Sequence, residues 1–296
     1  MVNVMESQLA TRATDDGRQP AEAAARPVLK WAGGKGRLLG ELLGRLPDDF
    51  HSRRATYHEP FIGGGALFFA LAGRGRLGHA RLSDANPSLI DVYLALRDCV
   101  DEVVAVLRGH VYERDHYYRV RALRPGELSL PERAARVIYL NKTCYNGLYR
   151  ENRRGEFNVP FGRYKNPTIC DEPNLRTAAR VLQGVDIGNR PFASILDYAQ
   201  AGDFVYFDPP YHPLSPTANF TTYDRHGFGP DDQRQLRDVF AALGERGVRA
   251  LLSNSDTPFI RELYDGFAID RVFVARAVNS KANGRGKVAE VIVGNY

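Results

Sequence analysis

Cysteine is scarce in this chain of 296 residues, which has only three. Cys99, Cys144 and Cys170 lie far apart, no CxxC pair occurs, and the seven histidines form no ligand spacing with them. We therefore expect neither structural disulfides nor a metal site, and the cysteine usage is typical of a protein of the reducing cytoplasm.

Long apolar runs are also missing. Stretches such as GALFFALAG have the size of a core segment and fall well short of the roughly 18 residues that a membrane-spanning helix needs. Residues 1–26 lack the apolar core of a signal peptide, and Asp15 and Asp16 argue against a transit peptide. We expect no membrane association and interpret residues 1–26 as a disordered leader.

Positive charge is present in modest excess, and one segment holds much of it. The chain has a net charge of +5 and a pI near 9.1. Residues 133–165 contain eight basic and two acidic side chains, a net +6. Aromatic residues are interleaved with these charges: Tyr139, Tyr145, Tyr149, Phe157, Phe161 and Tyr164. A charge run is usually a solvated face, but this interleaving, with a β-hairpin predicted in NGLYRENRRGEFNVP, favours nucleic-acid binding.

The pattern of apolar residues divides the chain into three parts and predicts an α/β fold. Residues 56–84 have the pattern of a βαβ unit, and strands and helices alternate again from residue 202 onward. Between them, apolar residues from Leu89 to Leu107 recur at helical spacing and predict one amphipathic helix. We expect a sheet domain formed by residues 27–86 and 171–296, with a helical, basic domain inserted at 87–170.

The C-terminal part contains further recognisable elements. GPDDQRQLRDVFAALGERG predicts a helix, VRALLSN a buried strand, and DTPFIRELY a helix that begins with an acidic cap. RVFVARAV and AEVIVGNY predict a terminal β-hairpin.

A run of glycines suggests close backbone approach to a ligand. Gly63, Gly64 and Gly65 lie between a predicted strand and a predicted helix, and Asp84 ends the next strand. An acid there can accept hydrogen bonds from ribose hydroxyls, although Asp84 can equally be a helix N-cap. The dinucleotide fingerprint is incomplete because Phe68 stands at its third glycine position, so a plain strand-to-helix turn is the alternative.

The stretch FVYFDPPYHP, residues 204–213, ends a predicted buried strand abruptly. Two prolines cannot continue a sheet ladder, so the bland interpretation is a stiff turn after a strand. The alternative is that Pro209 and Pro210 fix the backbone so that Asp208, a carbonyl and Tyr211 point at a ligand.

Four stretches occur in the order KWAGGK, EPFIGGGALF, LSDANPSLI and DPPYHPLSPTANFTTYDRHGF. Together with YNGLYRENRRGEFNVPFGRYKNP, they resemble the Dam-type DNA adenine-N6 methyltransferases, the α class or D12 family. The resemblance runs from about Leu29 to the C-terminus. It implies a Rossmann-like methyltransferase sheet with an inserted helical recognition domain, S-adenosylmethionine as methyl donor and double-stranded DNA as partner.

The resemblance also implies roles for individual residues. The cofactor-binding residues would be Trp31, Lys35, Phe61, Gly63, Gly65, Asp84 and Asp208. Catalysis would use Asp208, Pro209, Pro210 and Tyr211, which would hold the amino group of a flipped adenine for direct in-line transfer. The loop aromatics Phe220, Tyr223 and Phe228 would close over that base, or form an ordinary surface loop.

The DNA-binding residues would be Lys30, Tyr145, Asn146, Leu148, Arg150, Pro160, Arg163, Tyr164 and Lys165. Among them, Arg150 and Lys30 match residues that read guanines, and Leu148 and Pro160 match contacts to thymine methyls, which implies a GATC target. A cognate restriction endonuclease is compatible with this family.

Other functions fit the sequence less well. A non-catalytic DNA-binding protein would not need Asp208, Tyr211 and the donor loop, and a dinucleotide dehydrogenase would not need the basic insert. Cytosine-N4 enzymes more typically carry Ser, and RNA or protein-amide enzymes Asn, in place of Asp208.

Overall fold

The computed structural model describes residues 24–31, 33–48, 50, 55–152, 154–214, 227–275 and 287–296, so most of the expected leader lies outside the described residues. Its centre is a seven-stranded sheet in the order β3-β2-β1-β4-β5-β7-β6, in which only β7 runs antiparallel to its neighbours. The strands are β1 (Thr56–Glu59), β2 (His79–Asp84), β3 (Asp186–Asn189), β4 (Phe204–Phe207), β5 (Arg249–Ser255), β6 (Ala268–Ala275) and β7 (Lys287–Gly294). The α/β class predicted from the sequence is confirmed.

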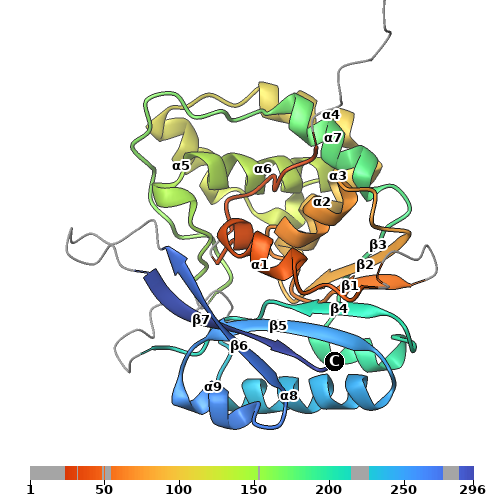
Figure 1. The fold of residues 1–296 in the computed structure, drawn as a ribbon. Coiled ribbons are helices and arrows are strands. Elements are labelled where there is room, and N and C mark those ends of the chain that lie inside the picture. Colours follow the sequence, from red (N-terminus) through yellow and green to blue (C-terminus); the bar gives the residue numbers. More distant parts are fainter. Residues whose placement is uncertain are drawn as a thin grey trace, which may run out of the picture.

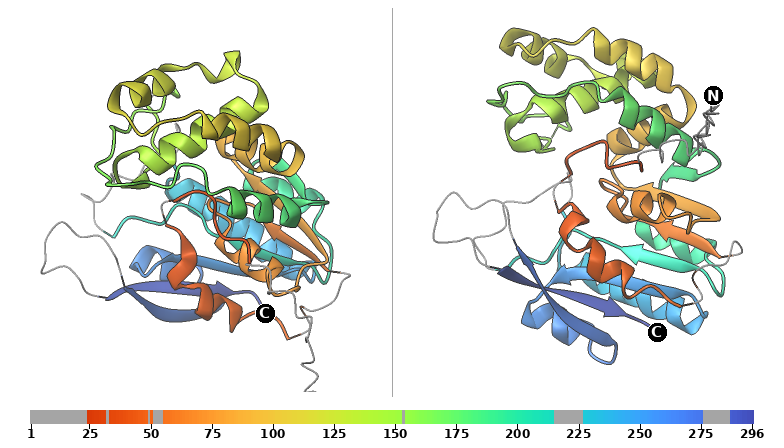
Figure 2. Two further views of the ribbon diagram at one scale, coloured as in Figure 1. Left: turned by 90° about the horizontal axis from the view of Figure 1, so that it is seen from above. Right: turned by 45° about the horizontal axis from the view of Figure 1, so that its top comes forward.

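Helices cover both faces of the sheet (Figure 1). The α-helices described are α1 (Leu39–Leu43), α2 (Ala66–Ala72), α3 (Pro87–Asp98), α4 (Val100–Arg108), α5 (Arg114–Ala122), α6 (Leu130–Thr143), α7 (Glu172–Leu182), α8 (Pro230–Glu245) and α9 (Pro258–Leu263). Helices α1 to α7 lie on one side, and α8 and α9 lie on the other (Figures 1 and 2). Each side has its own apolar core.

The helical segment between β2 and β3 is packed directly on the sheet. Helix α3 contacts β2, β3 and α6, so the apolar side chains of α3 to α7 join the same core as those of β1 and β2. This shared core fixes the helical part relative to the ends of the strands.

Strand β4 was predicted at the residues where it occurs. It lies in the middle of the sheet between β1 and β5, and all four of its side chains are buried. A strand covered on both faces has an uninterrupted apolar sequence, which is why its bounds could be predicted. The predicted βαβ unit at 56–84 and the terminal hairpin of β6 with β7 are also confirmed.

The single amphipathic helix predicted across Leu89–Leu107 is wrong. The chain forms α3 and α4, which are separated at Cys99, whose φ of −149° and ψ of 47° are not helical. Both helices bury apolar faces against α6 and α7. The spacing of apolar residues therefore predicted which side chains are buried, but it did not predict the break between the two helices.

Two predicted caps and the predicted hairpin also differ. Helix α3 is capped by Asn86, whose side chain accepts from the Leu89 N–H, rather than by Asp84. Helix α9 is capped by Thr257, because Asp256 is held by two arginines. The predicted hairpin has antiparallel pairing but no regular strands: Glu151 pairs with Phe157 and Cys144 with Phe161 as isolated bridges.

The turn between β1 and α2 requires glycine at Gly65. This residue has a φ of +68°, and a Cβ atom there would lie 2.8 Å from the Tyr93 hydroxyl. Gly75 has a similar φ of +64°, but a Cβ atom there would meet nothing within 4 Å.

We expect Gly65→Ala to destabilise the protein more than Gly75→Ala. Both substitutions place a side chain in the left-handed region, at a cost of about 1–2 kcal/mol, and only the first also overpacks the site, at about 1–3 kcal/mol more. Urea unfolding of the two variants measures the difference. Equal losses of stability would contradict the packing role of Gly65.

Candidate active site

The loops that follow β1, β2, β4 and β5 lie at one edge of the sheet, because these strands are parallel and adjacent. Three of the strands end on or beside an acid: Glu59 and Asp84 are the last residues of β1 and β2, and Asp208 directly follows β4. The loop of residues 30–35 reaches the same edge.

The predicted donor-binding residues are partly brought together. The Gly63 N–H donates to the Asp84 carboxylate at 3.1 Å, and the Gly63 carbonyl accepts from the Tyr93 hydroxyl at 2.9 Å. A Cβ atom on Gly63 would lie 2.8 Å from the Trp31 indole, so glycine permits that close contact. The Trp31 ring also packs on Tyr149, at 5.1 Å between centroids.

Phe61 contributes to an aromatic cluster rather than to this turn. Its ring packs against Phe192, Phe207 and Phe228. Phe228 is the described end of the predicted aromatic loop; Phe220 and Tyr223 lie outside the described residues.

Asp208 is the centre of the second half of the site. Lys35 Nζ lies 2.6 Å from Asp208 Oδ1, and the Ser253 hydroxyl donates to the same oxygen at 3.0 Å. Burial raises the pKa of Asp208, while the Lys35 cation and both hydrogen bonds oppose that rise. The ion pair therefore favours the carboxylate form in a buried position.

The residues after Asp208 are held by neighbouring elements. The Tyr211 hydroxyl donates to Glu290 on β7 at 3.0 Å, and Lys35 Nζ lies 4.4 Å from the centre of the Tyr211 ring. The Pro210 carbonyl accepts from Gln233 on α8 at 2.9 Å. These contacts fix the backbone and the ring beside the acid.

Glu59 is a charged residue at this edge that the sequence interpretation missed. It is 3% exposed and accepts from the Tyr57 hydroxyl at 2.7 Å. Burial raises its pKa well above the ordinary value, and the charges of Asp208 and Asp84 act in the same direction. The available signal was an acid at the end of a predicted strand, four positions before Gly63.

The predicted DNA-binding residues lie mainly on the surface of the helical part. Tyr145, Asn146, Leu148, Arg150, Pro160, Arg163 and Lys165 are exposed. Lys30 Nζ lies 5.1 Å from the centre of the Tyr164 ring, and the Tyr164 hydroxyl donates to the Cys144 carbonyl at 3.0 Å. The structure thus brings the loop of Lys30 beside the loops that begin at Tyr145 and end at Lys165.

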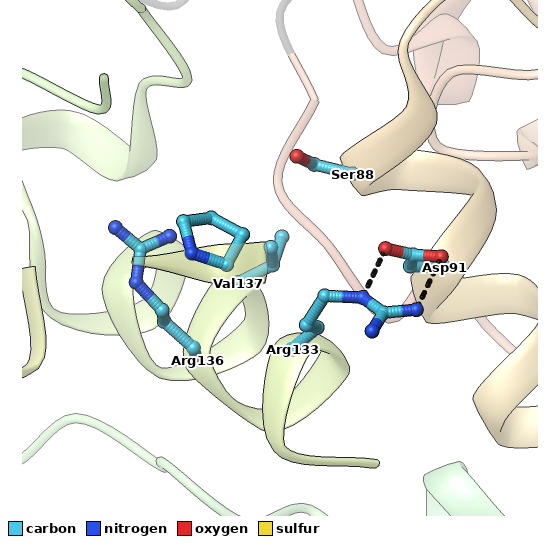
Figure 3. Close-up of a pocket in the computed structure, with 6 residues that line it drawn as sticks. Ser88, Asp91, Arg133, Arg136 and Val137 are labelled. Atoms are coloured by element: carbon cyan, nitrogen blue, oxygen red, sulfur yellow. Dashed lines mark hydrogen bonds and ion pairs between the residues drawn. The ribbon is translucent and has the colours of Figure 1, made fainter. Parts of the chain in front are cut away.

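Part of the basic segment faces inward instead of outward. Figure 3 shows a small pocket in which Arg133 binds Asp91, with distances of 2.7 and 3.3 Å. Arg136 is buried and donates to the carbonyls of Val120 and Arg121 at the end of α5. These two arginines are structural, so the net charge of the segment overstates its surface charge.

Among the described residues, no group of three or more His, Cys, Asp or Glu side chains is placed to hold a metal ion. No helix in the same residues combines the length and apolar character needed to cross a membrane.

Comparison with known proteins gives a consistent result. Residues 31–278 match the family model of the D12 class N6 adenine-specific DNA methyltransferases. The chain is 41% identical over 279 residues to type II methyltransferase M1.LlaDCHI of Lactococcus lactis, covering 92% of this chain and 95% of that protein. It is 39% identical over 286 residues to type II methyltransferase M.MjaIII of Methanocaldococcus jannaschii, covering 92% and 99%. It is 36% identical over 271 residues to DNA adenine methylase of Escherichia coli K12, covering 90% and 94%.

We expect Lys35→Met to raise the pKa of Asp208 further, because the substitution removes the cation that opposes the effect of burial. Carboxyl-carbon NMR titration of the labelled aspartates measures this change. Lys30→Met is the matched control, since Lys30 contacts Tyr164. An unchanged titration of Asp208 in Lys35→Met would contradict the assigned electrostatic role.

Proposed function

Because the chain belongs to the D12 class of N6 adenine-specific DNA methyltransferases, we propose that Asp208 holds the amino group of a flipped adenine for direct methylation at N6. The observation that carries this proposal is the placement of Asp208. It ends a central buried strand, and its two donors, Lys35 and Ser253, both bind Oδ1. Oδ2 is then the oxygen that can accept from the substrate.

The chemistry needs two fixed acceptors. The lone pair of adenine N6 is delocalised into the ring, so the amino group is a poor nucleophile. Acceptors at both N–H bonds favour a pyramidal nitrogen whose lone pair can attack. Asp208 Oδ2 and the Pro209 carbonyl would be these acceptors, and the neighbouring proline and the anchored Pro210 carbonyl limit reorganisation when charge develops.

The adenine must leave the duplex before it can reach this position, because N6 is inaccessible inside the stack. The Tyr211 ring, held through Glu290, offers a face on which the base can stack, a contact worth about 1–3 kcal/mol in single-strand binding proteins. Lys35 contacts both the Tyr211 ring and the Asp208 carboxylate, so the cation, the ring and the acid lie close together.

The donor site fits S-adenosylmethionine, which supplies an electrophilic methyl group on a sulfonium cation. Asp84 and Asp208 lie close enough to Glu59 to act on it electrostatically; the raised pKa of Glu59 favours its neutral form, so the two aspartates are the groups that favour a cationic ligand at this edge. Asp84 would accept from the ribose hydroxyls, and the turn at Gly63 and Gly65 would allow close approach of the backbone. Trp31, Lys35 and Phe61 would complete this site.

Direct transfer requires no nucleophile from the chain. The three cysteines are poor candidates for one, because burial raises the pKa of each thiol, that of Cys144 to about 11. The proposed role of the chain is therefore to bind, orient and exclude water.

The target proposed for the enzyme is GATC, on the basis of the resemblance to Dam-type recognition residues. Arg150 and Lys30 would read guanines, Leu148 and Pro160 would contact thymine methyls, and Tyr145 with Asn146 would fill the gap near the flipped base. Their exposure supports this assignment. Arg163, Tyr164 and Lys165 would contact the backbone beside them.

The helical segment 87–170 would then be the recognition part of an enzyme that works on DNA, in the cytoplasm and associated with the nucleoid. The relatives named type II methyltransferases support a cognate restriction endonuclease as a partner of this chain. A non-catalytic DNA-binding protein has no use for the anchored Asp208 and the acidic edge.

The direct test is to incubate the protein with S-adenosylmethionine and unmethylated plasmid DNA and to map N6-methyladenine by sequencing. We expect methylation of the adenine in GATC. Methylation at another site would overturn the recognition assignment, and no methylation would overturn the enzymatic one.

We expect Asp208→Ala to abolish methyl transfer while DNA binding largely persists, because the variant removes one acceptor from the amino group. A loss of at least about 10²-fold in the single-turnover rate is typical for such a group. Asp208→Asn should retain part of the rate, since its amide oxygen still accepts. Full-rate methylation by Asp208→Ala, measured beside its affinity for the duplex, would refute the role.

We expect Arg150→Ala to relax discrimination at one guanine by about 1–3 kcal/mol, because a bidentate base contact is lost. Arg163→Ala is the control: loss of a phosphate contact should weaken binding to all sequences similarly and reduce its salt dependence. Competition binding with single-base variants of the site measures both. Unchanged selectivity in Arg150→Ala would remove this residue from the recognition model.

A further inference from the structure

The end of strand β5 holds the loop after β4 through three consecutive buried polar residues. Ser253, Asn254 and Ser255 are each at most 2% exposed, which is unusual for polar side chains unless they are hydrogen-bonded. Apart from Tyr206 on β4, which Ser253 also contacts, their partners from other elements lie between residues 208 and 212 or in helix α8.

Two of these residues hold the loop backbone. The Asn254 side chain accepts from the His212 N–H at 3.0 Å, and the Ser255 hydroxyl donates to the His212 carbonyl at 2.6 Å. Gln233 fixes the Pro210 carbonyl and is itself bound to Asn254. The path of the backbone therefore does not depend on Ser253.

Ser253 has a different partner. Its single hydroxyl proton goes to Asp208 Oδ1, so the hydroxyl must accept from Tyr206, which lies 2.9 Å away. Tyr206 is fully buried in β4. The result is a directed chain in which Tyr206 donates to Ser253 and Ser253 donates to Asp208.

This chain determines which way the carboxylate faces. The terminal torsion of an aspartate is soft, so a carboxylate held by one flexible partner can rotate. Lys35 Nζ lies 2.6 Å from both Asp208 Oδ1 and the Gly33 carbonyl, and it reaches them on a four-carbon stem. Ser253 has a one-carbon stem on a central strand, so its hydroxyl fixes the direction of the hydrogen bond more firmly.

We propose that Ser253 is a positioning residue for methyl transfer, which fixes the carboxylate of Asp208 so that Oδ2 faces the adenine amino group. The proposal rests on the proposed function. It concerns the rate of the chemical step and leaves the binding of DNA and of the donor unchanged.

The test compares Ser253→Ala with Ser253→Thr and with the matched control Thr143→Ala. Thr143 is equally buried, but its hydroxyl donates to the Tyr139 carbonyl within helix α6 rather than to the carboxylate or to the loop after β4. We expect Ser253→Ala to lower the single-turnover methylation rate about tenfold or more, as for loss of a hydrogen bond to a charged group. The dissociation constants for duplex and donor should stay within about twofold of the wild type.

Two readouts separate positioning from simple stability. Ser253→Thr should restore most of the rate, because it keeps the hydroxyl. The acidic limb of the rate–pH profile should move to higher pH in Ser253→Ala, since the lost hydrogen bond lowers the pKa of Asp208 in the wild type. The other groups facing Asp208 stay in place: Lys35, Glu59, Tyr206, Tyr211 and, through Tyr211, Glu290.

Several results would overturn the proposal. They are a rate for Ser253→Ala within twofold of the wild type, an equal rate loss in Thr143→Ala, and no recovery in Ser253→Thr. If the alanine variant unfolds, Tyr206→Phe replaces it, because it removes the donor to Ser253; a wild-type rate there would also overturn the proposal. Absence of N6-methyladenine with the wild-type protein would instead contradict the proposed function.

Discussion

The ion pair between Lys35 and Asp208 is the interaction on which the site depends. A carboxylate at the end of a buried strand is costly to keep charged, and burial alone raises its pKa. Lys35 and Ser253 oppose that effect from two sides, one by charge and one by a hydrogen bond. Because both bind the same oxygen, they also give the acid an orientation, which a charge alone would not.

The short loop of residues 30–35 links this acid to the helical part of the molecule. The backbone of Lys30 both donates to and accepts from the Asn141 side chain on α6, each at 2.8 Å, while Lys35 binds Asp208. Trp31 between them packs on Tyr149 and touches the glycine turn. Lys30, Trp31 and Lys35 thus connect the proposed recognition surface, the proposed donor turn and the acid.

The sequence predicted those features that local patterns encode. Phe204–Phe207 is apolar because both faces of β4 are covered, and the glycine turn and the acids at strand ends have local signatures. The break at Cys99 was missed because apolar spacing continues through it. Arg133 and Arg136 point inward because they bind Asp91 and the end of α5. Ser253, Gln233 and Glu290 act through contacts with residues 208–211, which are distant from them along the chain. Neither a charge count nor a local motif predicts contacts between residues that are distant in sequence.

The most direct measurement of the central claim is a crystal structure of the protein with duplex DNA and a donor analogue that carries an amine in place of the sulfonium. The account predicts an extruded adenine stacked on Tyr211, with N6 within hydrogen-bond distance of Asp208 Oδ2 and the Pro209 carbonyl, and with the analogue's amine in line behind N6. Asp208 turned away from the amino group, or an adenine that remains in the helix, would contradict it.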